Sequence, residues 1–78
     1  MAQLRLFGRA AEAAGTSRDE IAADTVSGVL SAASSRYGDE FAKVAATCRV
    51  WVNGDDANPD ARVGPDDEVA LLPPVSGG

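Results

Sequence analysis

Histidine is absent from this 78-residue sequence, and cysteine occurs once. Without an imidazole, the chain has no base for a Ser–His or Cys–His nucleophile pair and no histidine ligand for a metal ion, so we expect no metal site. Cys48 has no second cysteine with which to form an internal disulfide, which favours a reducing compartment. These absences exclude histidine-dependent hydrolases and imidazole-bound metal centres.

Basic residues and long apolar segments are also scarce. Seven lysines and arginines stand against twelve acidic residues, which gives a net charge of −5. Nucleic-acid-binding proteins carry a basic surface, so this balance argues against nucleic acid and fits a basic partner. No apolar segment approaches the ~20 residues of a membrane span, and the first residues show no signal-peptide pattern. We therefore expect one small cytoplasmic domain that does not bind membranes.

Four short segments alternate polar and apolar residues, a pattern typical of half-buried strands. These segments are residues 2–7, 20–23 (the weakest), 48–52 and 68–72. The alternation directs one apolar set toward a core, namely Leu4, Leu6, Cys48, Val50, Val52, Val69 and Leu71. It directs a second apolar set to the opposite face, namely Phe7, Trp51, Ala70 and Leu72.

Helical periodicity occupies the middle of the chain. Thr25 is a suitable N-cap, and the apolar positions of residues 26–37 fall on one helical face. Gly28 lies inside this helix at a cost of up to about 1 kcal/mol relative to alanine. The helix is therefore expected to depend on packing. Residues 39–46 predict a short second helix, and the alanine-rich residues 8–14 predict one or two helical turns.

Turn signals separate the later strands. Asn53-Gly54 tolerates positive φ at both positions and predicts a tight turn, and residues 55–67 form a polar connection with room for a short strand. Two early strands, a crossing helix and late strands predict an α+β fold, a mixed sheet with one main helix packed on one face. We expect a domain at residues 1–74 and a flexible tail at residues 75–78.

The last six residues combine a stiff spacer with an unhindered end. Pro73-Pro74 cannot donate to a sheet ladder and favours an extended chain. At about 3.3 Å per residue the segment reaches roughly 20 Å. Gly77-Gly78 presents a carboxylate with no side chain near it, and such an end passes through a channel too narrow for a Cβ atom. The ordinary alternative is an inert chain end.

Residues 67–78, Asp-Glu-Val-Ala-Leu-Leu-Pro-Pro-Val-Ser-Gly-Gly, resemble the C-terminus of the small, sulfur-carrier subunit of molybdopterin synthase. That subunit belongs to the ubiquitin-like β-grasp superfamily. Leu6-Phe7, Glu12 and Gly15 match the opening of the family, and Val52-Asn53-Gly54 matches its middle strand and turn. The resemblance covers essentially the whole chain and implies a ubiquitin-like β-grasp fold.

The resemblance also implies a division of labour. An E1-like activating enzyme uses ATP to adenylate the carboxylate of Gly78, and sulfur from a donor then converts it to a thiocarboxylate. The tail, including Gly77, enters the large subunit of molybdopterin synthase, within a heterotetramer, and gives its sulfur to a pterin precursor. The chain lacks a Gly-x-x-x-x-Gly-Lys-Ser/Thr phosphate loop, so we expect it to bind no cofactor and to be non-catalytic alone.

Three other functions stay open. A carrier for thiamine or cysteine biosynthesis would differ only in the acceptor of the sulfur, although thiamine carriers are usually shorter and lack the proline pair. A ubiquitin-like modifier would be conjugated to lysines of other proteins. A plain interaction module would have an inert tail.

The outward apolar set lies at the root of the tail if the first and last strands are neighbours. Aromatic residues are enriched at interface centres, so this set predicts a docking site, although single exposed apolar residues are common on any surface. We assign partner binding to Phe7, Trp51, Leu72, Pro73, Pro74, Val75 and Ser76. Trp51 departs from the family, in which smaller residues are common at this position.

Two other features have plain interpretations. Cys48 shares the alternation of Val50 and Val52, so we expect a buried, inert thiol rather than one that handles sulfur. The acidic clusters at residues 39–40, 55–56 and 66–68 are either solvated turns or a surface that steers the chain toward basic partners.

Overall fold

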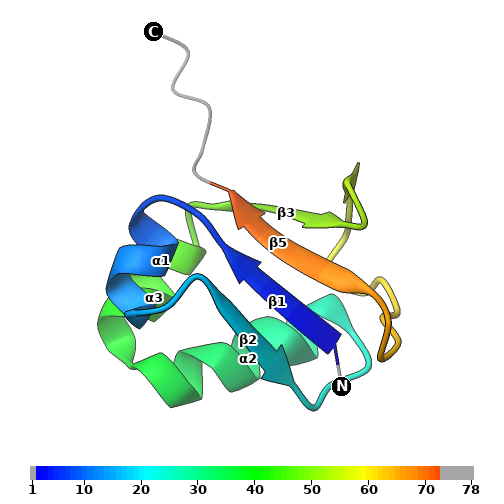
Figure 1. Ribbon diagram of the computed structural model, residues 1–78, viewed down its shortest axis with the longest axis horizontal. Coiled ribbons are helices and arrows are strands. Elements are labelled where there is room, and N and C mark those ends of the chain that lie inside the picture. Colours follow the sequence, from blue (N-terminus) through cyan, green and yellow to red (C-terminus); the bar gives the residue numbers. More distant parts are fainter. Residues whose placement is uncertain (1, 73–78) are drawn as a thin grey trace, which may run out of the picture.

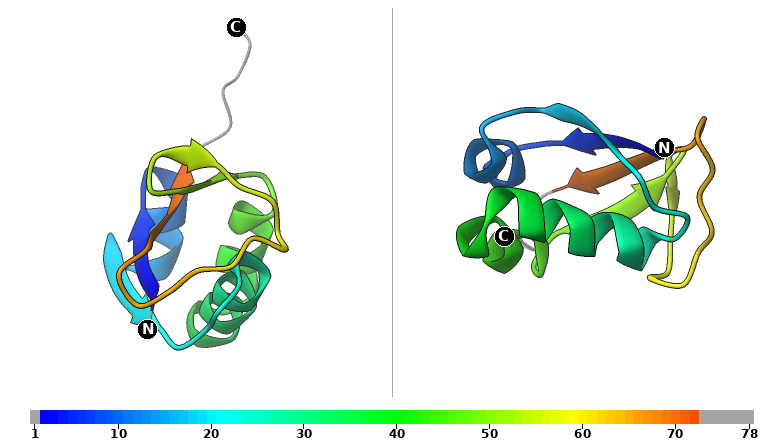
Figure 2. Two further views of the ribbon diagram at one scale, coloured as in Figure 1. Left: turned by 90° about the vertical axis from the view of Figure 1, so that its right-hand side faces the viewer. Right: turned by 90° about the horizontal axis from the view of Figure 1, so that it is seen from below.

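The computed structural model describes residues 2–72, which form one five-stranded sheet with the helices on one side (Figures 1 and 2). The elements are β1 (Ala2–Leu6), α1 (Arg9–Ala14), β2 (Arg18–Ile21), α2 (Val26–Tyr37), α3 (Asp39–Ala45), β3 (Arg49–Val52), β4 (Asp55–Asp56) and β5 (Glu68–Leu72). The strand order is β2-β1-β5-β3-β4. The sequence prediction of a mixed sheet with a main helix on one face is confirmed, and α1 and α3 extend that helical layer.

The central strand β5 connects the two halves of the sheet. It pairs parallel with β1, which places Leu4 beside Val69 and Leu6 beside Leu71. It pairs antiparallel with β3, which places Val50 on the other side of Leu71. The first and last strands are therefore neighbours. Because β1 and β5 are parallel, both end at the same margin of the sheet (Figure 1).

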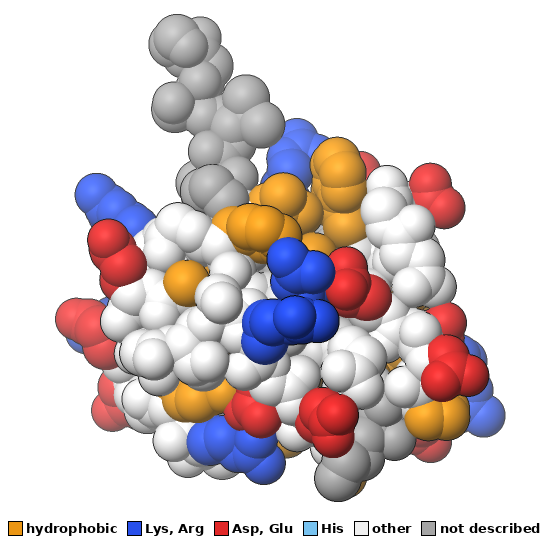
Figure 3. Space-filling view, in the orientation of Figure 1, with side chains coloured by type: hydrophobic (Ala, Val, Ile, Leu, Met, Phe, Trp, Pro, Cys, Tyr) orange, Lys and Arg blue, Asp and Glu red, His pale blue; other side chains and the backbone are white. Residues whose placement is uncertain are grey.

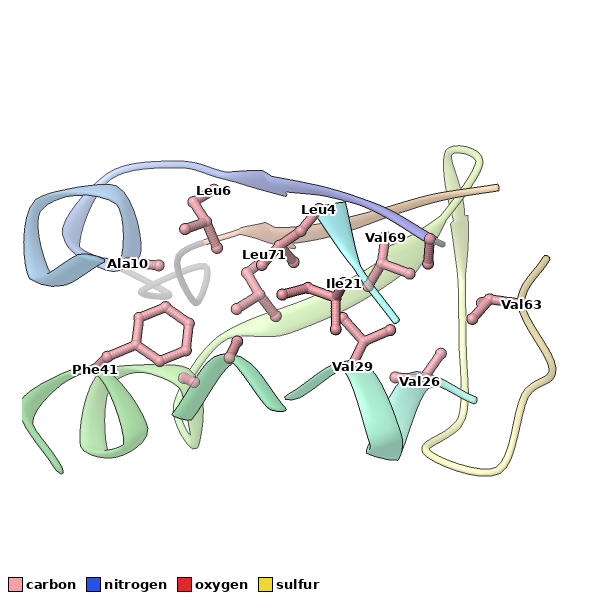
Figure 4. Packing of buried hydrophobic residues seen from close by; sticks show 13 residues of the cluster. Leu4, Leu6, Ala10, Ile21, Val26, Val29, Phe41, Val63, Val69 and Leu71 are labelled. Carbon is pink, nitrogen blue, oxygen red and sulfur yellow. The ribbon is translucent and has the colours of Figure 1, made fainter. Parts of the chain in front are cut away.

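The core lies between the sheet and the helices (Figure 4). Leu4, Leu6, Val69 and Leu71 of the sheet are 0–2% exposed. Opposite them α2 presents its buried face, which consists of Val26, Val29 and Ala33. Ala10 of α1 and Phe41 of α3 close one end of this layer and Val63 closes the other (Figure 4). The short helices therefore complete a core that α2 alone does not cover.

The start of α2 explains why a glycine stands inside this helix. The hydroxyl of Thr25 accepts a hydrogen bond from the backbone N–H of Gly28 at 3.0 Å, as the N-cap prediction requires. A Cβ atom at position 28 would lie 3.1 Å from that hydroxyl oxygen and 3.2 Å from the Cβ of Ala23. Glycine thus leaves room for the cap and for the chain that enters the helix.

The turn after β3 also follows the prediction. Asn53 and Gly54 have φ values of 53° and 88°, and the chain returns as the two-residue strand β4. The side-chain oxygen of Asn53 accepts from the N–H of Glu68 at 2.9 Å, and its amide donates to Asp67 at 3.0 Å. These bonds tie the turn to the beginning of β5.

The predicted limits of the second strand were wrong. β2 covers Arg18–Ile21 rather than residues 20–23. The reason is register: the N–H of Leu6 bonds to the carbonyl of Ser17 at 2.9 Å, and Ile21 pairs with Ala2 at the beginning of β1. Residues after Ile21 therefore extend past the partner strand.

The prediction that Cys48 is a buried strand residue was also wrong in part. Cys48 precedes β3 and is half-buried, as are Val50 and Val52. Its thiol donates to the carbonyl of Val44 at 3.3 Å. β3 lies next to the short edge strand β4, so its inner face is less covered than those of β1 and β5.

Candidate functional site

The outer face of the sheet, away from the helices, carries the predicted docking residues. The Cα pairings align Arg5 of β1, Ala70 of β5 and Trp51 of β3 in one row across the sheet. The next row, nearer the tail, contains Leu72 and Arg49, and Phe7 follows β1 beside them. We call Phe7, Trp51, Ala70 and Leu72 the apolar patch. The patch crosses β1, β5 and β3 at the point where the described part of β5 ends (Figure 3).

Exposure distinguishes the patch from the core. Phe7 and Trp51 are 38% and 37% exposed, the large apolar side chains with the greatest exposure in the described part of the chain. Leu72 and Ala70 are half-buried between them, whereas their neighbours Val69 and Leu71 are fully buried. The predicted alternation of β1, β3 and β5 is therefore confirmed. Binding of a partner by the patch stays a prediction.

Six predicted site residues fall outside the described residues. They are Pro73, Pro74, Val75, Ser76, Gly77 and Gly78. The structure places their attachment point, Leu72, within the apolar patch.

Sequence reasoning missed the arginines around the patch. The guanidinium carbon of Arg5 lies 5.6 Å from the centroid of the Phe7 ring, a cation–π arrangement. Arg49 pairs with Leu72 across β3 and β5, and Arg18 pairs with Arg5 across β2 and β1. The period-two pattern contains this signal, because Arg5 and Arg49 each stand two residues before an aromatic residue of the patch.

Within the described part of the chain, Arg5 and Arg49 form only long ion pairs. Arg5 lies 3.5 Å from Glu68, and Arg49 lies 3.7 Å from Asp56, with side chains between 36% and 75% exposed. Exposed pairs of this kind contribute little to stability, roughly 0–1 kcal/mol. Both guanidinium groups are therefore available to a partner.

A second polar cluster connects β2 to the end of α2. Asp19 accepts hydrogen bonds from the hydroxyl of Tyr37 and from the guanidinium of Arg36. The Tyr37 hydrogen bond, supported by Arg36, holds the pKa of the Asp19 carboxyl below its ordinary value of 3.8. Tyr37 also packs on Phe41 with 5.1 Å between ring centroids, so the cluster braces the helical layer. It is a structural feature rather than a reactive one.

The remaining thiol, surface hollow and acidic groups are poorly suited to catalysis or metal binding. Burial raises the pKa of the Cys48 thiol above 9.0, which disfavours the reactive thiolate. A shallow hollow of about 430 Å³ lies over β1 and β2, but its lining residues are all polar: Gln3, Arg18, Asp19 and Glu20. Within residues 2–72, no group of three or more acidic or cysteine side chains is placed to hold a metal ion. In the same range, no helix has the length and apolar character needed to cross a bilayer.

Comparisons with known proteins extend this geometry. The SAMP1 structure from Haloferax volcanii superimposes with a TM-score of 0.74 at 32% identity, covering 99% of this chain and 98% of that chain. Small archaeal modifier protein 1 from Methanosarcina acetivorans gives a TM-score of 0.80 at 26% identity, covering 99% and 95%. The BexX/CysO complex from Amycolatopsis orientalis gives 0.82 at 21% identity, covering 100% of both chains. No curated protein sequence matches the chain.

These superpositions, together with the mixed sheet and its helical layer, define a ubiquitin-like protein with the β-grasp fold, as the sequence predicted. The ThiS family profile matches residues 4–78, which is nearly the whole chain and includes the Gly-Gly end. The chain belongs to the ThiS family of ubiquitin-like sulfur carriers.

Proposed function

We propose that this chain is a sulfur carrier for molybdenum cofactor biosynthesis, the small subunit of a two-component molybdopterin synthase. The carboxylate of Gly78 attacks the α-phosphate of ATP on an activating enzyme, and pyrophosphate leaves. Sulfur from a donor then displaces AMP, and Gly78 becomes a thiocarboxylate. Within the large subunit the thiocarboxylate sulfur is transferred to the pterin precursor.

One observation carries this proposal: the family match runs through Gly78, and Leu72, from which the last segment departs, is part of the apolar patch. A tail that delivers a reactive group needs a nearby surface that positions it, because correct placement is a large part of catalysis. Phe7 follows β1 beside Leu72, and Trp51 lies one row away. The sequence of residues 67–78 supports the molybdenum pathway through its resemblance to the synthase subunit.

The proposal assigns the catalytic work to other proteins. We propose that the chain binds no cofactor, that ATP is bound by the E1-like activating enzyme, and that the large subunit forms a heterotetramer with it in the cytoplasm. The apolar patch, with Pro73, Pro74, Val75 and Ser76, contacts the large subunit.

The second candidate is a protein modifier. It is favoured by the 32% identity to SAMP1 of Haloferax volcanii, which belongs with the small archaeal modifier proteins. In that case the activated Gly78 would form an amide with a lysine of another protein instead of losing sulfur to a small acceptor. Both candidates require the same adenylation step.

Deletion of Gly78 tests the shared requirement. The variant should fold as the wild type does, because residues 2–72 already form the core cluster, which runs from Ala2 to Leu71. It should lose sulfur transfer in a synthase reconstituted from large subunit, activating enzyme, ATP and sulfide. A second variant, with one residue added after Gly78, tests whether the position of the terminal carboxylate matters as well as tail length, and it should also be inactive. Transfer by the deletion variant would refute the carrier proposal.

Intact-mass measurement on protein purified from its own cells separates the candidates. Replacement of one oxygen by sulfur supports a carrier, and attachment to other proteins supports a modifier. Reconstitution with the pterin precursor then distinguishes the molybdenum pathway from thiamine or cysteine biosynthesis.

A further inference from the structure

The charges on the outer face of the sheet are ordered along the strands. Arg5, Arg18 and Arg49 lie in the two rows nearest the tail. Glu20 and Glu68 flank Gln3 in the row behind them. One acidic residue, Asp56 of β4, lies beside Trp51 at the edge of the arginine rows. Figure 3 shows basic side chains directly beside the apolar patch, with acidic side chains next to them. A chain with a net charge of −5 thus places three arginines and one acidic residue in the two rows around its tail exit.

The edges of the sheet offer a partner no comparable site. In β2, Arg18 and Glu20 direct their backbone groups away from β1, since Ser17 bonds to Leu6. Side chains of the protein itself already form hydrogen bonds with these backbone groups. The Thr16 hydroxyl donates to the Arg18 carbonyl at 3.0 Å and lies 3.4 Å from the Arg18 nitrogen.

The outward backbone groups of Glu20, the second such residue of this edge, are also hydrogen-bonded to side chains. The N–H of Glu20 donates to the carboxylate of Asp19 at 2.8 Å, and its carbonyl accepts from Arg36 at 3.4 Å. The opposite edge strand, β4, has only two residues. Partners that bind by adding a strand need a free and extended edge. A partner is therefore expected to bind the face of the sheet rather than one of its edges.

We propose that the partner surface which receives the tail is an apolar recess whose rim carries carboxylates opposite Arg5 and Arg49. This inference rests on the proposed function, which requires that a partner protein bind the tail, and it specifies the chemistry of that partner. Arg5 flanks the apolar patch on the β1 side and Arg49 flanks it on the β3 side. Their weak ion pairs with Glu68 and Asp56 are exchanged for carboxylates of the partner.

The overall negative charge then contributes to specificity. An acidic rim is repelled by the chain as a whole, which carries a net charge of −5, and is attracted by the three arginines clustered around the tail exit. Like-charge contacts disfavour wrong orientations, and complementary charges guide the encounter. The tail therefore approaches the partner's site from one direction. Of the two interpretations of the acidic clusters, this proposal favours solvated turns.

The test compares two charge reversals of equal size. The matched pair consists of Arg49→Glu, which changes the proposed rim, and Arg62→Glu, which reverses one charge elsewhere. The double variant Arg5→Glu/Arg49→Glu changes the rim further. It has no double control, because adding Arg36→Gln to Arg62→Glu would remove the bond from Arg36 to Asp19 and disturb the fold. Arg62 is 82% exposed on the loop before β5, 3.9 Å from Asp24 and at the far end of β5 from Leu72. The probe is the host's purified activating enzyme, assayed by ATP–pyrophosphate exchange with the full chain as second substrate.

Arg49→Glu should raise the KM for the chain by about tenfold with kcat nearly unchanged, and the double variant should raise it further. Arg62→Glu should stay within about twofold, and the salt dependence of KM should weaken only in the rim variants. Thermal unfolding confirms that each variant is folded. Arg5→Gln/Arg49→Gln, which introduces no like charge beside Glu68, serves if the double reversal unfolds.

Equal KM values for folded Arg49→Glu and Arg62→Glu, or an unchanged KM in the folded glutamine variant, would overturn the acidic rim while leaving the carrier proposal intact. Absence of exchange with the wild-type chain would instead overturn the proposed function, and this inference with it.

Discussion

The two phenylalanines of the chain allow docking to be separated from folding by the same substitution at two positions. Phe7 is 38% exposed on the outer face, and Phe41 is fully buried in the core. The Phe7 ring lies 5.6 Å from the guanidinium carbon of Arg5. Phe41 packs on Tyr37 and closes the end of the helical layer (Figure 4). Phe7→Ala should therefore weaken binding, and Phe41→Ala should weaken the fold.

The expected magnitudes differ enough to measure. A fully buried phenylalanine replaced by alanine costs about 3–5 kcal/mol of unfolding free energy. A domain of this length has roughly 4–12 kcal/mol in total at the usual average per residue. Phe7→Ala loses a cation–π contact of about 0.5–1 kcal/mol and some half-buried surface, so about 1 kcal/mol is expected. In binding, a central aromatic residue contributes about 1–4 kcal/mol.

Thermal unfolding by circular dichroism and calorimetric titration with the large synthase subunit provide both readouts. Phe7→Ala should lower Tm by about 4–8 °C, the shift expected for 1 kcal/mol in a domain of this size, and should weaken affinity at least about fivefold. Phe41→Ala should lower Tm by well over twice as much. If Phe7→Ala unfolds like Phe41→Ala, the ring belongs to the core. If it folds and binds with unchanged affinity, the partner docks elsewhere.

Three further predictions concern the neighbours Leu71 and Leu72, the carboxylate of Asp19 and the thiol of Cys48. Leu71→Ala should destabilise the fold by about 2–5 kcal/mol, whereas Leu72→Ala should mainly reduce affinity; the reverse pattern in unfolding and titration experiments would contradict the strand register. The pKa of Asp19 is lowered in the folded state, so the stability that this carboxylate contributes is complete above about pH 4 and is lost as pH falls through the lowered pKa. Asp19→Asn should therefore be less stable at neutral pH and should show a flatter acid limb in unfolding curves, and an unchanged limb would exclude this source. The raised pKa of Cys48 predicts slow alkylation of the folded chain at pH 8, measured by intact mass. Cys48→Ala should retain sulfur transfer, and loss of transfer in a folded variant would show that this thiol handles sulfur.

Much of the fold was predictable because its signals are local. The alternation of residues 2–7 and 68–72 sorts side chains to two faces wherever the strands lie, since successive Cβ atoms point to opposite sides. The Thr25 cap and the Asn53-Gly54 turn depend on backbone geometry within a few residues, and both occur as predicted. The same locality made the exposure of Phe7 predictable.

The limits of β2 and the burial of Cys48 were not predictable in this way. β2 begins where Ser17 meets Leu6 and ends where Ile21 meets the first residue of β1, so its limits depend on a partner strand. Cys48 is only half-buried because β3 has a short neighbour at the edge of the sheet. Both depend on contacts between distant segments.

The sequence by itself determined which side chains face outward, where the turns lie and that a Gly-Gly pair follows the two prolines after the last strand. Only the tertiary structure decided which of those side chains meet. Arg5 and Arg49 are far apart in the chain, yet β5 lies between their strands and brings them to opposite sides of the apolar patch. The physical reason is that alternation along one strand sets the direction of a side chain, whereas pairing between strands sets its neighbours.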